Sequence, residues 1–454
     1  MSKYLSWDIG VKLIKITEYD YTLELNGIEL GASLEYGQYN LNDTAAEIVR
    51  LVDGSRTFKE IVEVLADKYN EKPFKVSHML KEFFRDAALG YNLHVKKTLE
   101  PIEGKIEYIE HREIYPKVAS IELTTRCNLR CMHCYGSYGE IEEHTLTLED
   151  VKHIMDDLHS LGVNVVELTG GDISVHPNLK EIVLYALDKG FWKVALLTNG
   201  VLLTQEMLDI IVANKERIIV QIDLQSLDDD YLTWFTKVPN TLERIKHNIA
   251  YLAKNGVMQR VATTLTKRNI NEMEAIADWA ASVGVSTIGF TPSLNMGRAC
   301  SADPDMAIDT PEAVEMINKM IKKIDKKHPR FRFRLDDTQR GQKNCGSVTR
   351  HVSITATGLL KYCAMDTTKY FESGFGNVLE KSIKDIYDEK ADFIRAIYEQ
   401  EAPQGNSSHC YACEKRDFCN GCMLRGLMSA KELKEECGWY MNELSDILKK
   451  EFEI

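Results

Sequence analysis

Cysteines are the residues of this chain whose number and spacing point most directly to chemistry. There are eleven in 454 residues, and all except Cys300 fall into patterned groups. The grouped residues are Cys127, Cys131, Cys134, Cys345, Cys363, Cys410, Cys413, Cys419, Cys422 and Cys437. The N-terminus, MSKYLSWDIG, has no apolar signal region, so we expect a reducing, cytoplasmic location. Disulfides are rare there, and clustered cysteines are more often metal ligands.

The first group, Cys127-x3-Cys131-x2-Cys134, directly follows a predicted strand. Loops at the carboxyl ends of strands carry the chemistry of many α/β folds. Three thiolates on one tight loop can hold three irons of a 4Fe–4S cluster and leave the fourth iron open for a ligand. A zinc site would normally be closed by a fourth ligand, for which His133 is the only local candidate. The spacing therefore favours an open iron–sulfur cluster.

Small and polar residues follow the next predicted strands at the same relative position. They are Thr169, Gly170, Gly171 and Asp172 after the second strand, Thr198 and Asn199 after the third, and Asp223 and Gln225 after the fourth. Arg260 lies on the fifth strand and could pair with a carboxylate. Glycines let the backbone approach a ligand closely. Each of these motifs is also common in plain turns, so it is their shared location at successive strand ends that favours a binding site.

The remaining cysteines lie near the C-terminus. The run Cys410-x2-Cys413-x5-Cys419-x2-Cys422 would by itself fit a structural zinc site. With Cys345, Cys363 and Cys437 the region holds seven cysteines, which do not divide into two closed four-ligand sites. They do fit one site with four thiols and one with three.

Strand-like and helical patterns alternate from residue 118 onward. The strands are expected at 118–123, 163–168, 194–197, 218–222, 261–265 and 287–290, and the helices near 147–161, 178–189, 204–213, 239–255, 270–282 and 311–327. Such alternation implies parallel strands with right-handed crossovers. Six units do not fill an eight-stranded barrel, so we predict an α/β fold with a partial (β/α)6 barrel over 116–327. Residues 328–454 form a cysteine-rich domain with little periodicity.

Residues 1–95 contain no cysteine and are expected to form a separate, winged-helix-like module. Two or three antiparallel strands are predicted between Leu13 and Tyr39, with turns at Asn26-Gly27 and Tyr36-Gly37. Three helices follow, the second starting with a capping box of Thr57 and Glu60. Residues 96–115 are charged and are expected to be a linker.

The composition is that of a globular protein, with 44% apolar and 28% charged residues. The net charge of −13 argues against a nucleic-acid-binding protein, since phosphate contacts need a basic surface. No apolar stretch reaches the length of a membrane helix.

The loop Thr124-Thr125-Arg126-Cys127-Asn128-Leu129-Arg130-Cys131-Met132-His133-Cys134-Tyr135 resembles the signature of the radical S-adenosylmethionine (SAM) superfamily. The resemblance implies that the open iron binds the amino and carboxylate groups of SAM, whose cleavage gives a 5′-deoxyadenosyl radical. It also implies that His133 lies against the adenine, with Tyr135 among the cofactor contacts. Gly170-Gly171-Asp172 resembles the family's GGE motif, with Asp in place of Glu. Asp223 and Gln225 stand where the family often has Ser and Asp.

The C-terminal cysteines resemble the SPASM extension of this superfamily, which holds two auxiliary 4Fe–4S clusters. Its crossed ligation implies that Cys345, Cys363 and Cys422 hold the first cluster. Cys410, Cys413, Cys419 and Cys437 would hold the second. The first cluster would then have an open iron, or Cys300 would complete it, although a lone cysteine is more often a small buried apolar residue.

Across nearly its whole length the arrangement is similar to sactipeptide and ranthipeptide maturases. The run Tyr39 to Ile48 resembles the leader-recognition element (RRE, PqqD-like) of peptide-modifying members, which binds a leader peptide by strand addition. The resemblance implies thioether formation in a ribosomally made precursor peptide, with a flavodoxin or ferredoxin as electron donor. Two alternatives remain: another SPASM activity, such as peptide carbon–carbon crosslinking or sulfatase-type maturation, and a non-enzymatic zinc-binding scaffold.

Overall fold

The computed structural model describes residues 3–8, 10–15, 20–26, 38–91, 93–104, 106–109, 114–301, 303–306, 308, 311–333, 344–366 and 374–454. The chain divides into two compact units, Met1–Ile114 and Tyr115–Ile454. In the described part of the chain, no helix has the length and apolarity that crossing a lipid bilayer requires.

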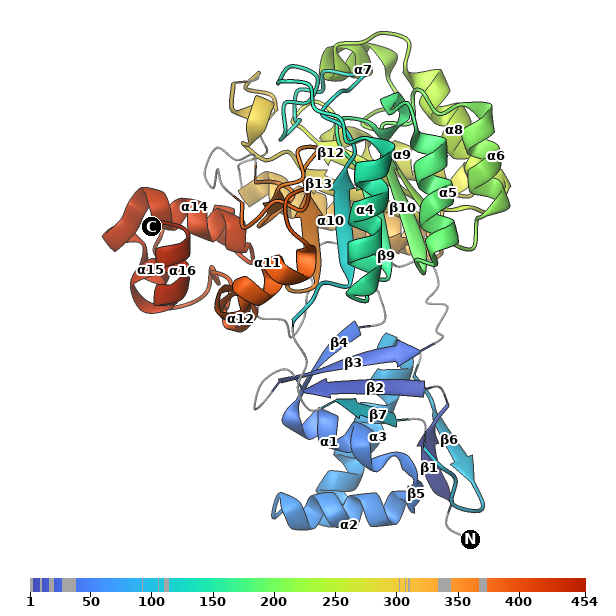
Figure 1. Ribbon diagram of the computed structural model, residues 1–454, viewed down its shortest axis with the longest axis vertical. Helices are drawn as coiled ribbons and strands as arrows, with labels where there is room; N and C mark the ends of the chain where they lie inside the picture. Colours follow the sequence, from blue (N-terminus) through green and yellow to red (C-terminus); the bar gives the residue numbers. More distant parts are fainter. Residues whose placement is uncertain are drawn as a thin grey trace. The chain divides into compact units, whose positions relative to one another are not determined.

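The first unit combines two small sheets with three helices (Figure 1). Its elements are β1 (Tyr4–Trp7), β2 (Gly10–Lys15), β3 (Asp20–Asn26), β4 (Gln38–Asn42), α1 (Asp43–Leu51), β5 (Asp53–Thr57), α2 (Phe58–Lys68), α3 (Pro73–Tyr91), β6 (Val95–Thr98) and β7 (Ile106–Ile109). The predicted antiparallel strands are present as β2, β3 and β4. The capping box of Thr57 and Glu60 is also present and starts α2. Gly27 and the turn at Tyr36-Gly37 lie outside the described residues.

The segment expected to be a linker belongs to this unit instead. Strand β6 pairs antiparallel with β1, and β7 pairs parallel with β2. Ile106 and Tyr108 of β7 pack against the apolar core of the unit. The charged sequence of β6 explains why this strand was not predicted. It reads Val-Lys-Lys-Thr and exposes both lysines, so it lacks the run of apolar residues that marks a buried strand. The unit therefore extends about twenty residues beyond the predicted boundary.

The second unit is built on a sheet in the order β14-β13-β12-β11-β10-β9-β8-β15-β16. The six predicted strands are β8 (Val118–Glu122), β9 (Val165–Thr169), β10 (Lys193–Thr198), β11 (Ile218–Asp223), β12 (Met258–Leu265) and β13 (Thr287–Pro292). They are all parallel and adjacent in chain order. The predicted partial barrel of six strand–helix units is therefore confirmed.

The crossover helices are α4 (Leu148–Ser160), α5 (Leu179–Lys189), α6 (Gln205–Ala213), α7 (Asp229–Thr236), α8 (Leu242–Lys254), α9 (Met273–Val283) and α10 (Pro311–Lys327). Helices α4 and α5 lie in front of the strands in Figure 1. Helix α4 shows why they form: Thr147 and Asp150 make a capping box, and a stripe from Val151 to Leu158 is buried. Helix α7 was not predicted, because its eight residues include Tyr, Trp, Phe and two Thr, which are mediocre helix formers.

The cysteine-rich region is continuous with this sheet. Strand β14 (Arg332–Phe333) extends it beyond β13, and β15 (His351–Ile354) pairs parallel with β8 at the other side. Strand β16 (Leu360–Lys361) then pairs antiparallel with β15. Helices α11 (Ile383–Glu389), α12 (Ala391–Glu399), α13 (Arg416–Cys419), α14 (Met423–Leu433), α15 (Gly438–Asn442) and α16 (Asp446–Glu451) complete the chain. Cys363 thus follows a strand pair that is anchored on the first barrel strand.

Candidate active site

The first three cysteines lie on the loop between β8 and α4, and the loop is tied to the barrel at both ends. Leu123 donates its N–H to Thr169 O at 2.9 Å, and Thr124 pairs with Thr145 in an isolated bridge. The thiols lie close enough to influence one another. Burial raises the pKa of Cys127 to about 11, with a smaller rise from Cys134. Burial, followed by the neighbouring Cys127 and Cys134, also raises the pKa of Cys131. The structure therefore brings the three predicted ligands together.

Arg298 fixes the backbone of this loop, and sequence analysis missed it. Its side chain is 14% exposed and pairs with Glu140 at 2.8 Å. Its Nε donates to Cys131 O at 3.0 Å, and its backbone N–H donates to Cys134 O at 3.0 Å. The preceding Gly297 lies against the same backbone, because a Cβ there would come within 2.3 Å of Tyr135 O. In the sequence, the Gly297-Arg298 pair after the sixth strand is the feature that could have indicated this role.

The Gly-Gly-Asp motif packs against the cysteine loop. Gly171 N donates to Thr124 O at 2.7 Å, and Asp172 N donates to Arg126 O at 3.0 Å. A Cβ on Gly171 would stand 2.0 Å from Arg126 O, so only glycine lets the two segments approach this closely. Gly170 has a φ of +136°, which an L side chain rarely adopts. The glycines are therefore required by the contact between the second strand end and the loop.

The carboxylate of Asp172 is buried and bonded to the chain itself. One oxygen accepts from the N–H of Ser174 at 2.9 Å and from the Ser174 hydroxyl. The other accepts from Asn199 N at 2.7 Å and from the Thr198 hydroxyl at 2.9 Å. Burial raises the pKa of Asp172, while the hydrogen bonds act in the opposite direction. Asp172 therefore joins the ends of β9 and β10.

The third strand end reaches the cysteine loop through Asn199. Its Nδ2 donates to Asn128 Oδ1 at 2.8 Å, and its Oδ1 accepts from Val201 N at 3.0 Å. Asn128 directly follows Cys127. The Thr198 hydroxyl accepts from Gly200 N at 3.1 Å. These contacts hold Thr198 and Asn199 beside the cysteines.

His133 has an open hydrogen-bonding position. Its ring stacks on Phe235 of α7, with centroids 4.9 Å apart and planes 23° apart. Burial lowers the pKa of His133 to about 4, so the ring is neutral at physiological pH. Its Nδ1 is buried and has no hydrogen-bond partner. Because buried polar atoms in proteins are nearly always paired, this nitrogen fits a bound group that supplies the partner.

The end of the fourth strand and the beginning of the fifth contribute charge, because Asp223 ends β11 and Arg260 lies near the start of β12. Burial, followed by Asp172, raises the pKa of Asp223 to about 7, and Arg260 counters this rise. A Cβ on Gly289 of β13 would lie 2.7 Å from Arg260 Nη2, so this glycine makes room for the guanidinium. Gln225 is used differently: its Oε1 accepts from the backbone N–H of Thr264 at 2.5 Å. Gln225 therefore supports the carboxyl end of β12.

The seven C-terminal thiols form two groups. Burial raises the pKa of Cys363 to about 12, with further rises from Cys345 and Cys422. Burial likewise raises the pKa of Cys437, with further rises from Cys410 and Cys413.

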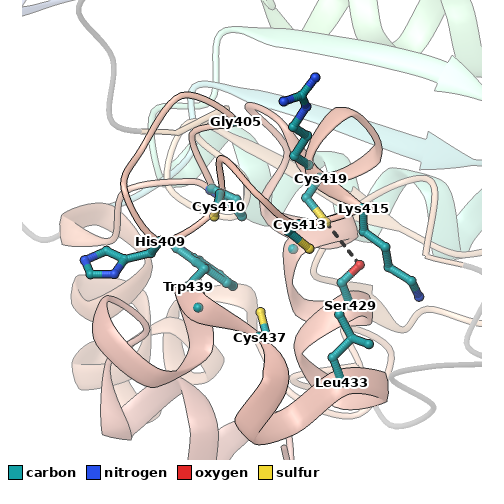
Figure 2. A pocket seen from close by; sticks show the side chains of 14 residues that line it. Gly405, His409, Cys410, Cys413, Lys415, Cys419, Ser429, Leu433, Cys437 and Trp439 are labelled. Atoms are coloured by element: carbon teal, nitrogen blue, oxygen red, sulfur yellow. Dashed lines mark hydrogen bonds between the residues drawn. The ribbon is translucent and has the colours of Figure 1, made fainter.

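Cys419 belongs with Cys437. Burial raises its pKa to about 11, and both Cys437 and Cys413 add to the rise. Figure 2 shows this second group, Cys410, Cys413, Cys419 and Cys437, around one pocket that His409 and Trp439 also line. Within the described residues, no three His, Cys, Asp or Glu side chains are arranged to hold a single metal ion. The four thiols of the second group share one pocket.

Cys300 is exposed. It lies on the short helix Gly297–Ser301, and its thiol donates to Asn295 O at 3.3 Å.

Comparison with known proteins identifies the barrel. The sequence model of the radical SAM superfamily matches residues 121–280, which run from strand β8 into helix α9. AlbA, the antilisterial bacteriocin subtilosin biosynthesis protein of Bacillus subtilis (strain 168), is 28% identical over 438 residues, 94% of each chain. Residues 121–280 therefore carry a radical SAM domain. Residues 32–88 also match the family of the coenzyme PQQ synthesis protein D (PqqD).

Two further proteins are similar to most of this chain, one in sequence and one in fold. The AdoMet-dependent heme synthase of Methanosarcina barkeri (strain Fusaro / DSM 804) is 29% identical over 339 residues, 71% of this chain and 95% of the relative. Streptococcus suis SuiB bound to its precursor peptide SuiA superposes with a TM-score of 0.61 at 14% identity, covering 98% of this chain and 99% of SuiB. At that identity the likeness concerns the fold.

The radical SAM match implies SAM and a 4Fe–4S cluster as cofactors. Its residues fit both groups. Three thiols share one loop, His133 presents an unpartnered buried nitrogen, and Gly289 leaves space for the Arg260 guanidinium.

Proposed function

We propose that this protein is a peptide maturase of the subtilosin type, which installs thioether crosslinks between a cysteine sulfur and a carbon atom of a ribosomally made precursor peptide. The observation that carries the proposal is the combination of three features in one chain. They are a PqqD-like match at 32–88, a radical SAM match at 121–280, and two further groups of thiols. The similarity to AlbA extends over 94% of both chains.

The proposed organisation is a leader-recognition domain, a radical SAM core and a C-terminal SPASM domain with two auxiliary clusters. Three 4Fe–4S clusters are proposed in all. Cys127, Cys131 and Cys134 would hold the catalytic cluster. Cys345, Cys363 and Cys422 would hold the first auxiliary cluster, and Cys410, Cys413, Cys419 and Cys437 the second.

In this proposal SAM, bound at the catalytic cluster and cleaved with one electron, supplies a 5′-deoxyadenosyl radical that removes a hydrogen atom from the peptide. The chain binds and orients SAM. Arg260 pairs with its carboxylate, His133 lies against the adenine, and Tyr135, Thr198, Asn199 and Asp223 complete the contacts. Thr169 and the two glycines line the second strand end. Asp172 would support the site by holding Ser174, Thr198 and Asn199. Gln225 would support it by holding the backbone of Thr264.

The first unit, with its PqqD match, supports a peptide substrate. In the sheet β4-β3-β2-β7, strand β7 of the same chain covers the β2 side, and β4 is the outer strand on the other. A leader peptide adding to β4 would gain backbone hydrogen bonds, which give affinity without demanding one sequence. We also propose a flavodoxin or ferredoxin as electron donor and a cytoplasmic location, where the clusters are kept reduced.

The proposal is tested with anaerobically reconstituted full-length protein. Three clusters correspond to about twelve irons per chain. Incubation with SAM, dithionite and the precursor peptide should give 5′-deoxyadenosine and a peptide that has lost two hydrogen atoms per thioether. The variant with Cys127, Cys131 and Cys134 replaced by Ala should lose about a third of the iron and all of the product.

Two results would contradict it. If a precursor whose cysteines are alkylated were still crosslinked, the activity would be carbon–carbon bond formation or another SPASM reaction. If the reconstituted protein bound zinc and no iron, it would be a zinc-binding scaffold.

A further inference from the structure

Three polar side chains form a hydrogen-bonded chain across strands β8, β9 and β15. The Ser120 hydroxyl on β8 donates to Glu167 Oε2 on β9, and His351 Nε2 on β15 lies 2.7 Å from the same hydroxyl oxygen. A hydroxyl has one proton, which here goes to the carboxylate, so the histidine nitrogen must donate to Ser120. The chain therefore runs from the imidazole N–H through the hydroxyl to the carboxylate.

Glu167 points into the interior of the barrel. On β12, Gln259 donates to a backbone carbonyl of helix α8 at 2.9 Å, so it faces the outer helices. Its neighbour Met258 faces the interior, because successive strand residues point to opposite faces. Directly paired residues of neighbouring strands share a face, and Met258 is linked by such pairing to Ile219 and then to Ala195. Ala195 pairs with Glu167, which places the carboxylate on the inner face.

The two ends of the chain differ in their access to water. Ser120 is 4% exposed and the Glu167 side chain 12%, whereas the His351 side chain is 40% exposed. Thr169 follows Glu167 on the same face of β9, about 6.6 Å along the strand, and its carbonyl accepts from the cysteine loop. The chain thus begins inside the barrel, close to the candidate active site, and ends at solvent.

A second carboxylate nearby is bonded differently. Glu122, two residues after Ser120 on β8, lies 3.4 Å from Lys361 on β16, and the two side chains are 6% and 5% exposed. An ammonium group has no acceptor and cannot take over a proton. The partners of Glu167 in the chain are a hydroxyl and an imidazole, which can both accept a proton and pass it on. Of these two carboxylates, Glu167 is therefore the one with a path for protons.

We propose that Glu167, Ser120 and His351 form a proton relay, which carries the proton of the substrate thiol from the barrel interior to solvent. This rests on the proposed function. In thioether formation the S–H and C–H bonds of the peptide break and the C–S bond forms. The 5′-deoxyadenosyl radical takes the hydrogen atom of the carbon, an oxidised iron–sulfur cluster takes one electron, and Glu167 takes the proton of the thiol.

The proton then leaves along the chain. Glu167 donates it to Ser120, and Ser120 donates its own proton to Nε2 of His351, whose ring for this step is the tautomer protonated at Nδ1. The imidazolium loses the Nδ1 proton to water and becomes the tautomer that donates to Ser120. The two tautomers exchange through water, which reaches the ring. One passage therefore exports one proton per thioether and leaves the carboxylate ready to accept again.

The relay is tested with reconstituted full-length enzyme and the precursor peptide used to test the maturase proposal. His351→Gln is the most informative variant, because the glutamine amide can donate to Ser120 but cannot pass a proton on. Thioether formation should slow by at least about tenfold. Excess imidazole should raise the rate of this variant severalfold and leave the wild-type rate unchanged. Ser120→Ala interrupts the chain and should be as slow, whereas Ser120→Thr keeps the hydroxyl and should retain most of the rate.

Two controls separate a relay from structural support. Cleavage of SAM without peptide releases no thiol proton, so 5′-deoxyadenosine formed from SAM and dithionite alone should appear at the wild-type rate in every variant, with unchanged iron content. His328→Gln is the matched control. Its imidazole also bonds a carboxylate, that of Asp278 at 2.7 Å, but it follows helix α10 outside the relay. It should form thioether at the wild-type rate with or without imidazole.

The outcomes separate the two proposals. Thioether formation at the wild-type rate in His351→Gln and Ser120→Ala, or a slow His351→Gln enzyme that imidazole does not accelerate, would overturn the relay and leave the maturase proposal standing. A wild-type enzyme that forms no thioether would count against the maturase proposal itself. If Ser120→Ala takes up no iron, the His351→Gln result decides, because that variant keeps a donor to Ser120.

Discussion

Replacing Asp172 by Asn tests whether this carboxylate supports the site or contacts SAM. The amide has the same shape and offers one acceptor oxygen where the carboxylate offers two. Either the N–H of Ser174 or that of Asn199 would then face an NH₂ group. A buried donor without an acceptor costs about 1–3 kcal/mol. We therefore expect the thermal midpoint of unfolding of the second unit to fall by about 1–4 °C.

SAM affinity should change much less. The carboxylate oxygens already accept from Ser174, Thr198 and Asn199, and a carboxylate has about four acceptor positions. We expect the Kd for SAM, measured by equilibrium dialysis with iron-loaded protein, to change by less than about threefold, which is under 1 kcal/mol. Ser174→Ala is the control, since it removes one donor to the same oxygen and should lower the midpoint by less. A tenfold loss of SAM affinity at an unchanged midpoint would show that the carboxylate faces the cofactor, and the reasoning would be wrong.

Three further predictions concern the thiol groups. Gly171→Ala should push the cysteine loop away, because the new Cβ would lie 2.0 Å from the carbonyl oxygen of Arg126. Iron analysis should then show a loss of about four irons per chain. The control Gly405→Ala, whose Cβ would make only ordinary contacts, should lose no iron. Ser429→Ala should lower the reduction potential of the cluster proposed for Cys410, Cys413, Cys419 and Cys437. The Ser429 hydroxyl lies 3.0 Å from Cys419 Sγ and would become the donor once that sulfur binds iron. A loss of about 1.4 kcal/mol is tenfold in the reduction equilibrium and about 59 mV in an EPR-monitored titration, and an unchanged potential would refute this role. Cys300→Ser should leave the iron content unchanged, because the thiol bonds Asn295 O; a loss of iron would make it a ligand.

The barrel could be predicted because its signals are periodic and repeated. Strands such as Val165–Thr169 are largely buried, and helices such as Leu148–Ser160 begin at capping boxes. Both patterns follow from local chemistry. Strand β6 (Val95–Thr98) carries no such pattern. Its stability comes from pairing with β1, which lies at the other end of the unit's sequence. Tertiary pairing of this kind leaves no trace in a short window of sequence.

The candidate site shows the same division. The cysteines and the residues at the strand ends could be found, because spacing and strand order place them at one edge of the sheet. Arg298 and the Glu122–Lys361 pair could not, since their partners are 167 and 239 residues away along the chain. The use of Asp172 also escaped prediction. Its sequence position indicates a cofactor contact, and only the positions of Ser174, Thr198 and Asn199 show that its oxygens are occupied.

The sorting of the C-terminal thiols shows why neighbours in sequence need not share a site. Cys419 and Cys422 are three residues apart, yet Cys419 lies with Cys437 and Cys413, while Cys422 lies with Cys363 and Cys345. Cys419 ends helix α13, and Cys422 precedes α14. Between them the backbone turns at Gly421, which has a φ of +69°. Because only glycine adopts that conformation without strain, the turn can direct the two thiols to different groups. Gly421→Ala should therefore loosen both auxiliary groups at once, whereas Cys422→Ala should affect only the first.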